Sequence, residues 1–167
     1  GACERFAKEK YNLIITIDCG TTSFEAIDFA NKKKIDVVVL DHHRVIDQPP
    51  KAYAFVNPHQ EDDEYPFKDL CGAAVAFKIV CAMYARANIE EGQEKWFLDS
   101  VALATITDVM PLLGENRTLV KYGLLVLAQT ERVGLKALME VAGVQPAFNK
   151  DSLTTNLNPW TLGFALG

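Results

Sequence analysis

Residues 12–18 read NLIITID, and residues 35–43 read IDVVVLDHH. Each segment is a short, largely apolar run followed by an aspartate, Asp18 in the first and Asp41 in the second, as expected for a strand buried on both faces of a parallel sheet. Between them, residues 24–34 place apolar side chains at helical spacing, after Ser23, a typical N-cap residue. A strand, a helix and a second strand form a βαβ unit, whose right-handed crossover makes the two strands parallel.

The remaining sequence predicts further elements around this unit. Residues 44–69 contain four prolines and an acidic run, and indicate a long loop with one short strand at residues 52–56. Four helical segments follow, at residues 73–87, 95–107, 116–129 and 135–141. We therefore predict an α/β fold in which a parallel sheet with flanking helices is followed by a helical half.

The composition limits the class of protein. A chain of 167 residues with 49% hydrophobic residues and a net charge of −5 fits one folded domain better than a disordered segment. No apolar run is long enough to span a bilayer, and the first ten residues are too charged for a signal peptide, so we expect a cytoplasmic protein without membrane contact. The four cysteines form no Cys-x-x-Cys pair, which disfavours a zinc ribbon.

The acidic charge bears on nucleic-acid binding. A free-standing nucleic-acid module normally carries a basic surface, which this composition does not indicate. A site that gathers carboxylates to hold metal ions is nevertheless locally acidic, even where its substrate is a polyanion. The net charge therefore does not exclude a metal-dependent enzyme that acts on nucleic acid.

Residues of the kind that bind metals follow both predicted strands. Asp18 follows the first strand, and Asp41, His42 and His43 follow the second. Because ligands of parallel α/β sheets bind at the carboxyl ends of the strands, we expect these side chains at one edge of the sheet. Carboxylates beside neutral imidazoles suit Mn²⁺, Zn²⁺ or Fe²⁺. Aspartate is also common in turns, so a polar turn that only caps the strands stays open.

A third candidate ligand, Asp108, follows the apolar helix predicted at residues 95–107. A carboxylate at the carboxyl end of a helix opposes the helix dipole unless a cation neutralises it. The position fits a metal ligand and fits equally a solvated aspartate that begins the turn at Pro111.

Taken in order, Asp18, the triplet at residues 41–43 and Asp108 resemble the DHH phosphoesterase superfamily, which is named for its Asp-His-His triplet. Within the superfamily, the chain is most similar to the RecJ family of single-strand-specific exonucleases. The resemblance includes VNP at 56–58, YPF at 65–67, LCGA at 70–73, VAFK at 75–78, DVMPL at 108–112 and GENR at 114–117. His59 stands where lysine is more usual in that family, and we expect it in a surface loop.

The resemblance implies a catalytic site with two cations, Mn²⁺ or Mg²⁺. Asp18 would bridge both cations, and His42 and Asp108 would bind one of them. His43 would face the substrate phosphate. Asp41 would orient a histidine from behind the metal ligands, as carboxylates often do around metal sites.

The resemblance also implies a function, which is hydrolysis of single-stranded DNA from its 5′ end in DNA repair and recombination. Single-stranded DNA and a single-strand-binding protein would be the partners. A DHH phosphodiesterase for short oligonucleotides or cyclic dinucleotides, and a non-catalytic DHH replication scaffold, are the alternatives. We expect residues 1–167 to be a partial catalytic domain that lacks a first metal motif upstream and a second, DHHA1-type domain downstream, and that is inactive alone.

Overall fold

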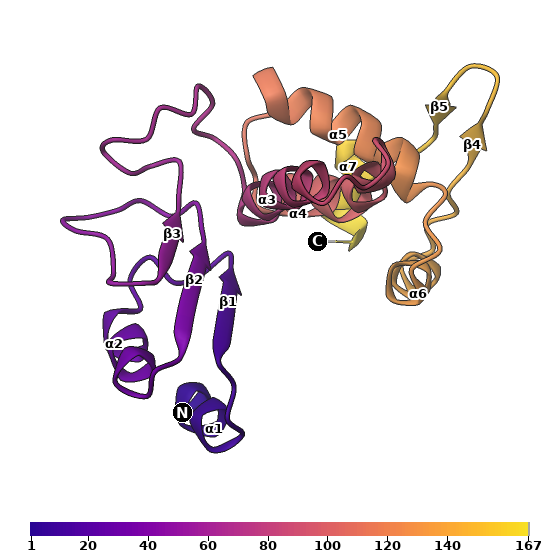
Figure 1. The fold of residues 1–167 in the computed structure, drawn as a ribbon. Helices are drawn as coiled ribbons and strands as arrows, with labels where there is room; N and C mark the ends of the chain where they lie inside the picture. The colour runs from indigo at the N-terminus through magenta and orange to yellow at the C-terminus, as the bar shows by residue number, and fades with distance from the viewer. Residues whose placement is uncertain (167) are drawn as a thin grey trace. The chain divides into compact units, whose positions relative to one another are not determined.

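The computed structural model describes residues 1–166, and these residues divide into two compact units (Figure 1). The first unit is Gly1–Ala76 and the second is Phe77–Gly167, so that the boundary falls inside helix α3 (Gly72–Arg86). The assignment of residues 1–167 to one partial DHH domain stays a prediction.

The first unit contains the predicted parallel sheet. Its strands are β1 (Leu13–Ile17), β2 (Asp36–Leu40) and β3 (Ala54–Val56), in the order β1-β2-β3, and both pairings are parallel. Helix α2 (Phe24–Lys32) connects β1 to β2, which confirms the βαβ unit. Ser23 is the N-cap residue of α2, as predicted, but its side chain makes no capping hydrogen bond.

Helices α1 (Ala2–Lys8) and α2 lie against one face of this sheet (Figure 1). The core between them is made of alternate residues of β2 and the inner side of α2: Ile27, Ala30, Ile35, Val37 and Val39, with Ala7 and Ile14 packed at its edge. The sequence analysis did not predict α1. Its seven residues include three charged ones and bury no side chain fully, so the segment has no clear apolar period.

The prediction that both strands are buried on both faces is wrong for β1. Leu13, Ile15 and Ile17 are 49%, 55% and 50% exposed. These side chains alternate with Ile14, which packs toward α2, so they lie on the opposite face of the sheet. Strand β2 fits the prediction better, because it lies between β1 and β3 and carries three buried residues. The apolar run alone could not separate an edge strand from a central one.

The second unit is helical, as predicted. After α3 it contains a 3₁₀ turn η1 (Gln93–Phe97), α4 (Leu98–Thr107), α5 (Gly114–Leu127), α6 (Val133–Val141), a hairpin of β4 (Phe148–Asn149) and β5 (Thr154–Thr155), α7 (Pro159–Thr161) and a π-helical turn η2 (Leu162–Leu166). The sequence analysis did not predict the hairpin, because its strands have only two residues each. Among residues 1–166, no helix combines the length and the apolar character that a membrane span needs.

A buried carboxylate fixes the turn that follows α5. Asp99, in the first turn of α4, accepts hydrogen bonds from Oγ1 of Thr130 at 2.8 Å and from Nε of Arg132 at 2.9 Å. Its position also suits the dipole of α4, whose amino end favours negative charge. Asp99 therefore ties the segment that leads into α6 to the start of α4.

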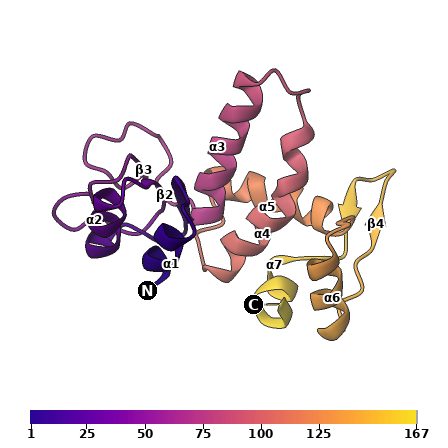
Figure 2. The same cartoon turned by 60° about the horizontal axis from the view of Figure 1, so that its bottom comes forward.

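The core of the second unit depends on a close crossing of α4 and α5 (Figure 2). Gly123 of α5 lies at this crossing. A Cβ atom added there would be 2.4 Å from the carbonyl oxygen of Leu98 and 2.5 Å from Cβ of Ala102. Because a backbone carbonyl cannot rotate away like a side-chain end, only glycine fits this crossing.

We predict that Gly123→Ala destabilises the chain by about 1–3 kcal/mol, the usual cost of overpacking a core. Urea denaturation followed by circular dichroism measures this change. Gly134→Ala in α6 is the matched control, since a Cβ there meets no atom within 4 Å. Equal unfolding midpoints for the two variants would contradict the close crossing.

Candidate metal centre

A polar residue directly follows each of the three strands, at the same edge of the sheet. Asp18 follows β1, Asp41 follows β2 and Asn57 follows β3. The hydrogen-bond ladder continues one step past the strands, because the N–H of Asp18 donates to the carbonyl of Leu40 at 3.0 Å and the N–H of Asp41 donates to that of Val56 at 3.0 Å. The parallel register therefore holds the backbone of both aspartates side by side, as the sequence predicts.

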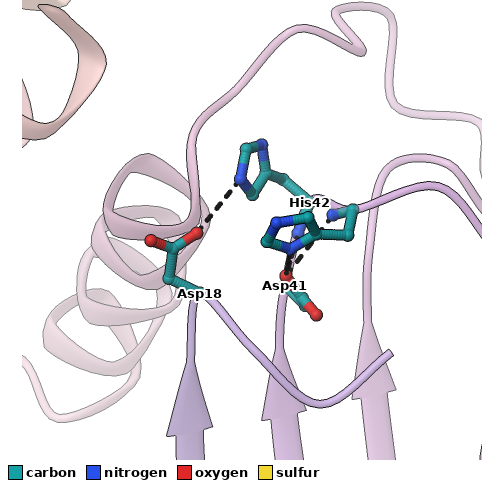
Figure 3. A group of neighbouring side chains, drawn as sticks. Asp18, Asp41 and His42 are labelled. Carbon is teal, nitrogen blue, oxygen red and sulfur yellow. Dashed lines mark hydrogen bonds and ion pairs between the residues drawn. The ribbon is translucent and has the colours of Figure 1, made fainter. Parts of the chain in front are cut away.

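Asp18 and His42 point toward one another across this edge (Figure 3). Oδ1 of Asp18 lies 3.0 Å from Nε2 of His42. Asp18 has a φ of 62°, a left-handed conformation that aspartate tolerates better than most residues. Its side chain is 56% exposed, whereas that of His42 is 9% exposed. One oxygen and one nitrogen donor thus lie together at the carboxyl edge of the sheet, where the Asp18 carboxylate is exposed and Nε2 of His42 is buried.

Asp41 differs from Asp18, because it is buried and both of its oxygens are engaged in hydrogen bonds. Its Oδ2 accepts from the backbone N–H of Thr21 at 2.9 Å and from the hydroxyl of Thr21 at 2.6 Å. Its Oδ1 accepts from the backbone N–H of His42 at 2.8 Å and pairs with Nδ1 of His43 at 2.7 Å. Asp41 therefore holds the start of the triplet against the loop after β1.

These hydrogen bonds decide the charge of Asp41. Burial alone would raise its pKa, since it disfavours the charged form. The hydrogen bonds from Thr21, His43 and the backbone of His42 outweigh burial and hold the pKa of Asp41 well below its ordinary value. Because a carboxylate can only accept, Nδ1 of His43 must carry the proton between them. This fixes the tautomer of His43, as carboxylates do for histidines beside metal sites.

Asn57 completes the network from β3, and the sequence analysis did not assign it a role. Its side-chain amide donates to the hydroxyl of Thr21 at 3.1 Å and to the backbone carbonyl of His43 at 2.8 Å. Asn57 is fully buried, and Thr21 is 3% exposed. The signal that singled out Asp18, a polar residue directly after a strand, also holds for Asn57. Thr21 offered no comparable signal, because its role depends on how the loop after β1 folds back.

The cluster offers donor atoms of the kinds that divalent cations bind. Asp18, Asp41, His42 and His43 each have one ligand-type atom within 4.8 Å of the others. The oxygens of Asp41 already accept hydrogen bonds from Thr21, His42 and His43, so the donor atoms that Asp41 does not hold are the carboxylate of Asp18 and Nε2 of His42 and of His43. A carboxylate and an imidazole suit Mn²⁺, and a carboxylate suits Mg²⁺. The residues present therefore fit such an ion.

Two further residues, Asp108 and His59, were singled out from the sequence. Asp108 is exposed and follows α4 in the second unit, at the end of the helix as predicted. Its membership in the cluster stays a prediction. His59 lies in the loop after β3, as expected, and is partly buried there; its backbone N–H donates to Oδ1 of Asn57 at 2.9 Å. Burial, and then the charge of Arg44, lower the pKa of His59.

Comparisons with curated proteins give close relatives. The chain is 38% identical over 165 residues to the single-stranded-DNA-specific exonuclease RecJ of Dickeya dadantii, a match that covers 93% of this chain and 27% of that protein. It is 38% identical over 140 residues to the protein of the same name from Bacillus subtilis, covering 83% of this chain and 17% of that protein. The chain therefore spans about a quarter or less of the length of these relatives.

Solved structures agree with these relatives. A crystal structure of exonuclease RecJ bound to manganese superimposes with a TM-score of 0.76 at 29% identity, covering 96% of this chain and 38% of that one. A crystal structure of RecJ in complex with Mn²⁺ from Thermus thermophilus superimposes with a TM-score of 0.77 at 30% identity, covering 98% of this chain and 23% of that one. The fold is thus that of part of RecJ.

The family comparison bears on the triplet itself. A family model described as the DHH family, N-terminal domain, matches residues 2–105. The match includes both strands that deliver the cluster and covers more than half of the chain. With the Asp-His-His triplet after β2 and RecJ proteins among its relatives, this chain belongs to the DHH family.

Proposed function

We propose that this chain forms part of the catalytic centre of a single-stranded-DNA-specific exonuclease of the RecJ type, which hydrolyses phosphodiester bonds from the 5′ end. The observation that carries the proposal is the pair of Asp18 and His42, 3.0 Å apart at the carboxyl edge of the parallel sheet. The names of the relatives supply the substrate class, since they are called single-stranded-DNA-specific exonucleases. Manganese in the similar solved structures supports the choice of metal.

The metal ligands in this proposal are Asp18, His42 and Asp108. Asp18 would bridge two cations, as the resemblance to the family implies, and its exposed carboxylate is compatible with this role. His42 would offer Nε2, the ring nitrogen that already faces Asp18. When bound, two cations would ionise the attacking water and stabilise the departing oxygen.

The other two members of the triplet would act beside the ligands. His43 is exposed, and its Nδ1 is held by Asp41, so its opposite nitrogen, Nε2, is directed away from Asp41. When protonated, this nitrogen can donate to a phosphate oxygen of the substrate. Asp41 would orient His43 and the backbone of His42 without touching the metal or the DNA.

The partners and the location follow from the proposed substrate. Single-stranded DNA is the first partner, and a protein that coats single strands in the cell is the second. The curated relatives come from bacteria, whose DNA lies in the cytoplasm, so we place this protein there. A phosphodiesterase for short oligonucleotides or cyclic dinucleotides would share the metal site but not the preference for long single strands.

The substrate assignment is tested on the complete protein that carries this chain, with Mn²⁺ and long DNA labelled at either end. We expect mononucleotides to be released from the 5′ end of single strands, with little degradation of blunt duplexes. Dinucleotides and cyclic dinucleotides serve as competing substrates. Their preferential hydrolysis would replace the exonuclease by the short-substrate alternative, and an absence of hydrolysis would favour the non-catalytic scaffold.

We predict that Asp18→Asn in the same protein lowers Mn²⁺-dependent hydrolysis by more than about 100-fold, since even residues behind metal ligands contribute about 10- to 100-fold. Asp28→Asn, on the exposed side of α2, makes the same chemical change away from the cluster and serves as the control. Thermal melting should show both variants folded. Near-normal hydrolysis by Asp18→Asn at saturating Mn²⁺ would exclude a bridging carboxylate.

The depressed pKa of Asp41 predicts a pH dependence of stability. A carboxyl group whose pKa is lower in the folded state stabilises the fold fully above its unfolded pKa, about 3.9, and loses this contribution as the pH falls toward the folded pKa. We therefore expect Asp41→Asn to be less stable than the wild type at about pH 6, with the difference shrinking below about pH 4. Urea denaturation in the presence of a metal chelator measures the free energy of unfolding of both proteins as a function of pH. A difference in unfolding free energy that stays constant between about pH 6 and pH 3 would contradict a charged, hydrogen-bonded Asp41.

A further inference from the structure

We propose that Gly72, the first residue of α3, is a positioning residue for Asp18. The absence of a side chain at Gly72 lets the start of α3 lie directly against Asp18, which keeps the Asp18 carboxylate beside His42. This inference deepens the proposed function and rests on the assignment of Asp18 as a metal ligand.

The contact between Gly72 and Asp18 is too close for any side chain. A Cβ atom at Gly72 would be 2.6 Å from Cα of Asp18, 2.6 Å from its Cβ and 2.7 Å from its Oδ1. Cα and Cβ are the backbone and the base of the Asp18 residue, which cannot swing away as the end of a long side chain can. Oδ1 belongs to the carboxylate itself, so the added atom would also press directly on the metal-binding group. Gly72 lies in a helix and has no positive φ, so the close approach, and not the backbone conformation, requires glycine.

Neither partner in this contact can move away easily. The backbone of Asp18 is held by its hydrogen bond to Leu40, and its carboxylate is held on the other side by His42, 3.0 Å away. The start of α3 is anchored by the buried residues around Gly72, which are Leu70, Cys71, Ala74 and Val75, each no more than 3% exposed. An added methyl group would therefore displace the carboxylate from His42 or loosen the start of the helix.

Helix propensity works against a purely structural explanation. Alanine forms helices better than glycine, so Gly72→Ala should favour α3 if the helix alone were concerned. A loss of stability or of metal binding in this variant would then come from the clash of the added Cβ with Asp18, and not from a weaker helix former. The same substitution is available at two glycines outside this contact, Gly134 in open space and Gly123 at the α4–α5 crossing.

The test is calorimetric titration of this chain with Mn²⁺ alone. We expect Gly72→Ala to weaken Mn²⁺ binding by about 10-fold or more, within the range for residues that orient metal ligands. Gly134→Ala should bind like the wild type. Gly123→Ala should melt at a lower temperature and yet bind Mn²⁺ normally at temperatures where it is folded. These two controls distinguish a loss of folding stability from a displacement of the Asp18 carboxylate.

A double-mutant cycle gives a second readout that needs no metal. Asp18→Gly removes the carboxylate and suits the positive φ at this residue. We expect the decrease in urea midpoint caused by Gly72→Ala to be smaller in the Asp18→Gly background, because part of the clash is then absent. This comparison is available even where Gly72→Ala is too unstable for calorimetry. An equal decrease in both backgrounds would overturn the inference.

The outcomes distinguish this inference from the proposed function. Normal Mn²⁺ binding by Gly72→Ala, with weakened binding by Asp18→Asn, would overturn the role of Gly72 and leave the metal site standing. Normal binding by both variants would overturn both. Weakened binding by both, with Gly134→Ala unaffected, is the result expected.

Discussion

The geometry of the site depends on one buried carboxylate, that of Asp41. It accepts hydrogen bonds from the loop after β1 through Thr21 and from its own strand end through His42 and His43. A buried charge is costly unless hydrogen bonds satisfy it, and here they do so well enough to lower its pKa. The same bonds that make the charge tolerable fix the backbone of the triplet and the tautomer of His43.

The parallel sheet brings this network and the side chain of Asp18 together at one edge. Each strand ends at the same edge, and the ladder carries on past the strand ends through the N–H groups of Asp18 and Asp41. Asn57, after β3, links the hydroxyl of Thr21 to the backbone of His43. Three strand ends therefore share one network, and Asp18, His42 and His43 extend outward from it. Hydrogen bonds from neighbouring strand ends thus hold Thr21, Asp41 and Asn57 in place.

Sequence reasoning identified most of this arrangement for a physical reason. A parallel βαβ unit brings polar residues after its strands to one edge, so Asp18 and the triplet were predictable from two short runs. Asn57 carried the same signal in a weaker form, because β3 has only three residues. Thr21 and Gly72 carried no such signal, since both act through segments that are distant in sequence from their partners. Asp108 was placed at the end of a helix, as predicted, and its role as a ligand stays a prediction.

The sequence by itself determined the βαβ unit with its parallel strands, the helices α3 to α6 that follow, and the residue types at the carboxyl edge of the sheet. These depend on periodicity and on local chemistry, which a sequence displays directly. Only the tertiary structure decided that one face of β1 is exposed and that Gly72 lies against Asp18. It also decided that both carboxylate oxygens of Asp41 accept hydrogen bonds within the protein, whereas the carboxylate of Asp18 is exposed. The reason is that burial, hydrogen-bond saturation and close approach depend on atoms brought together from separate parts of the chain, and no local pattern records them.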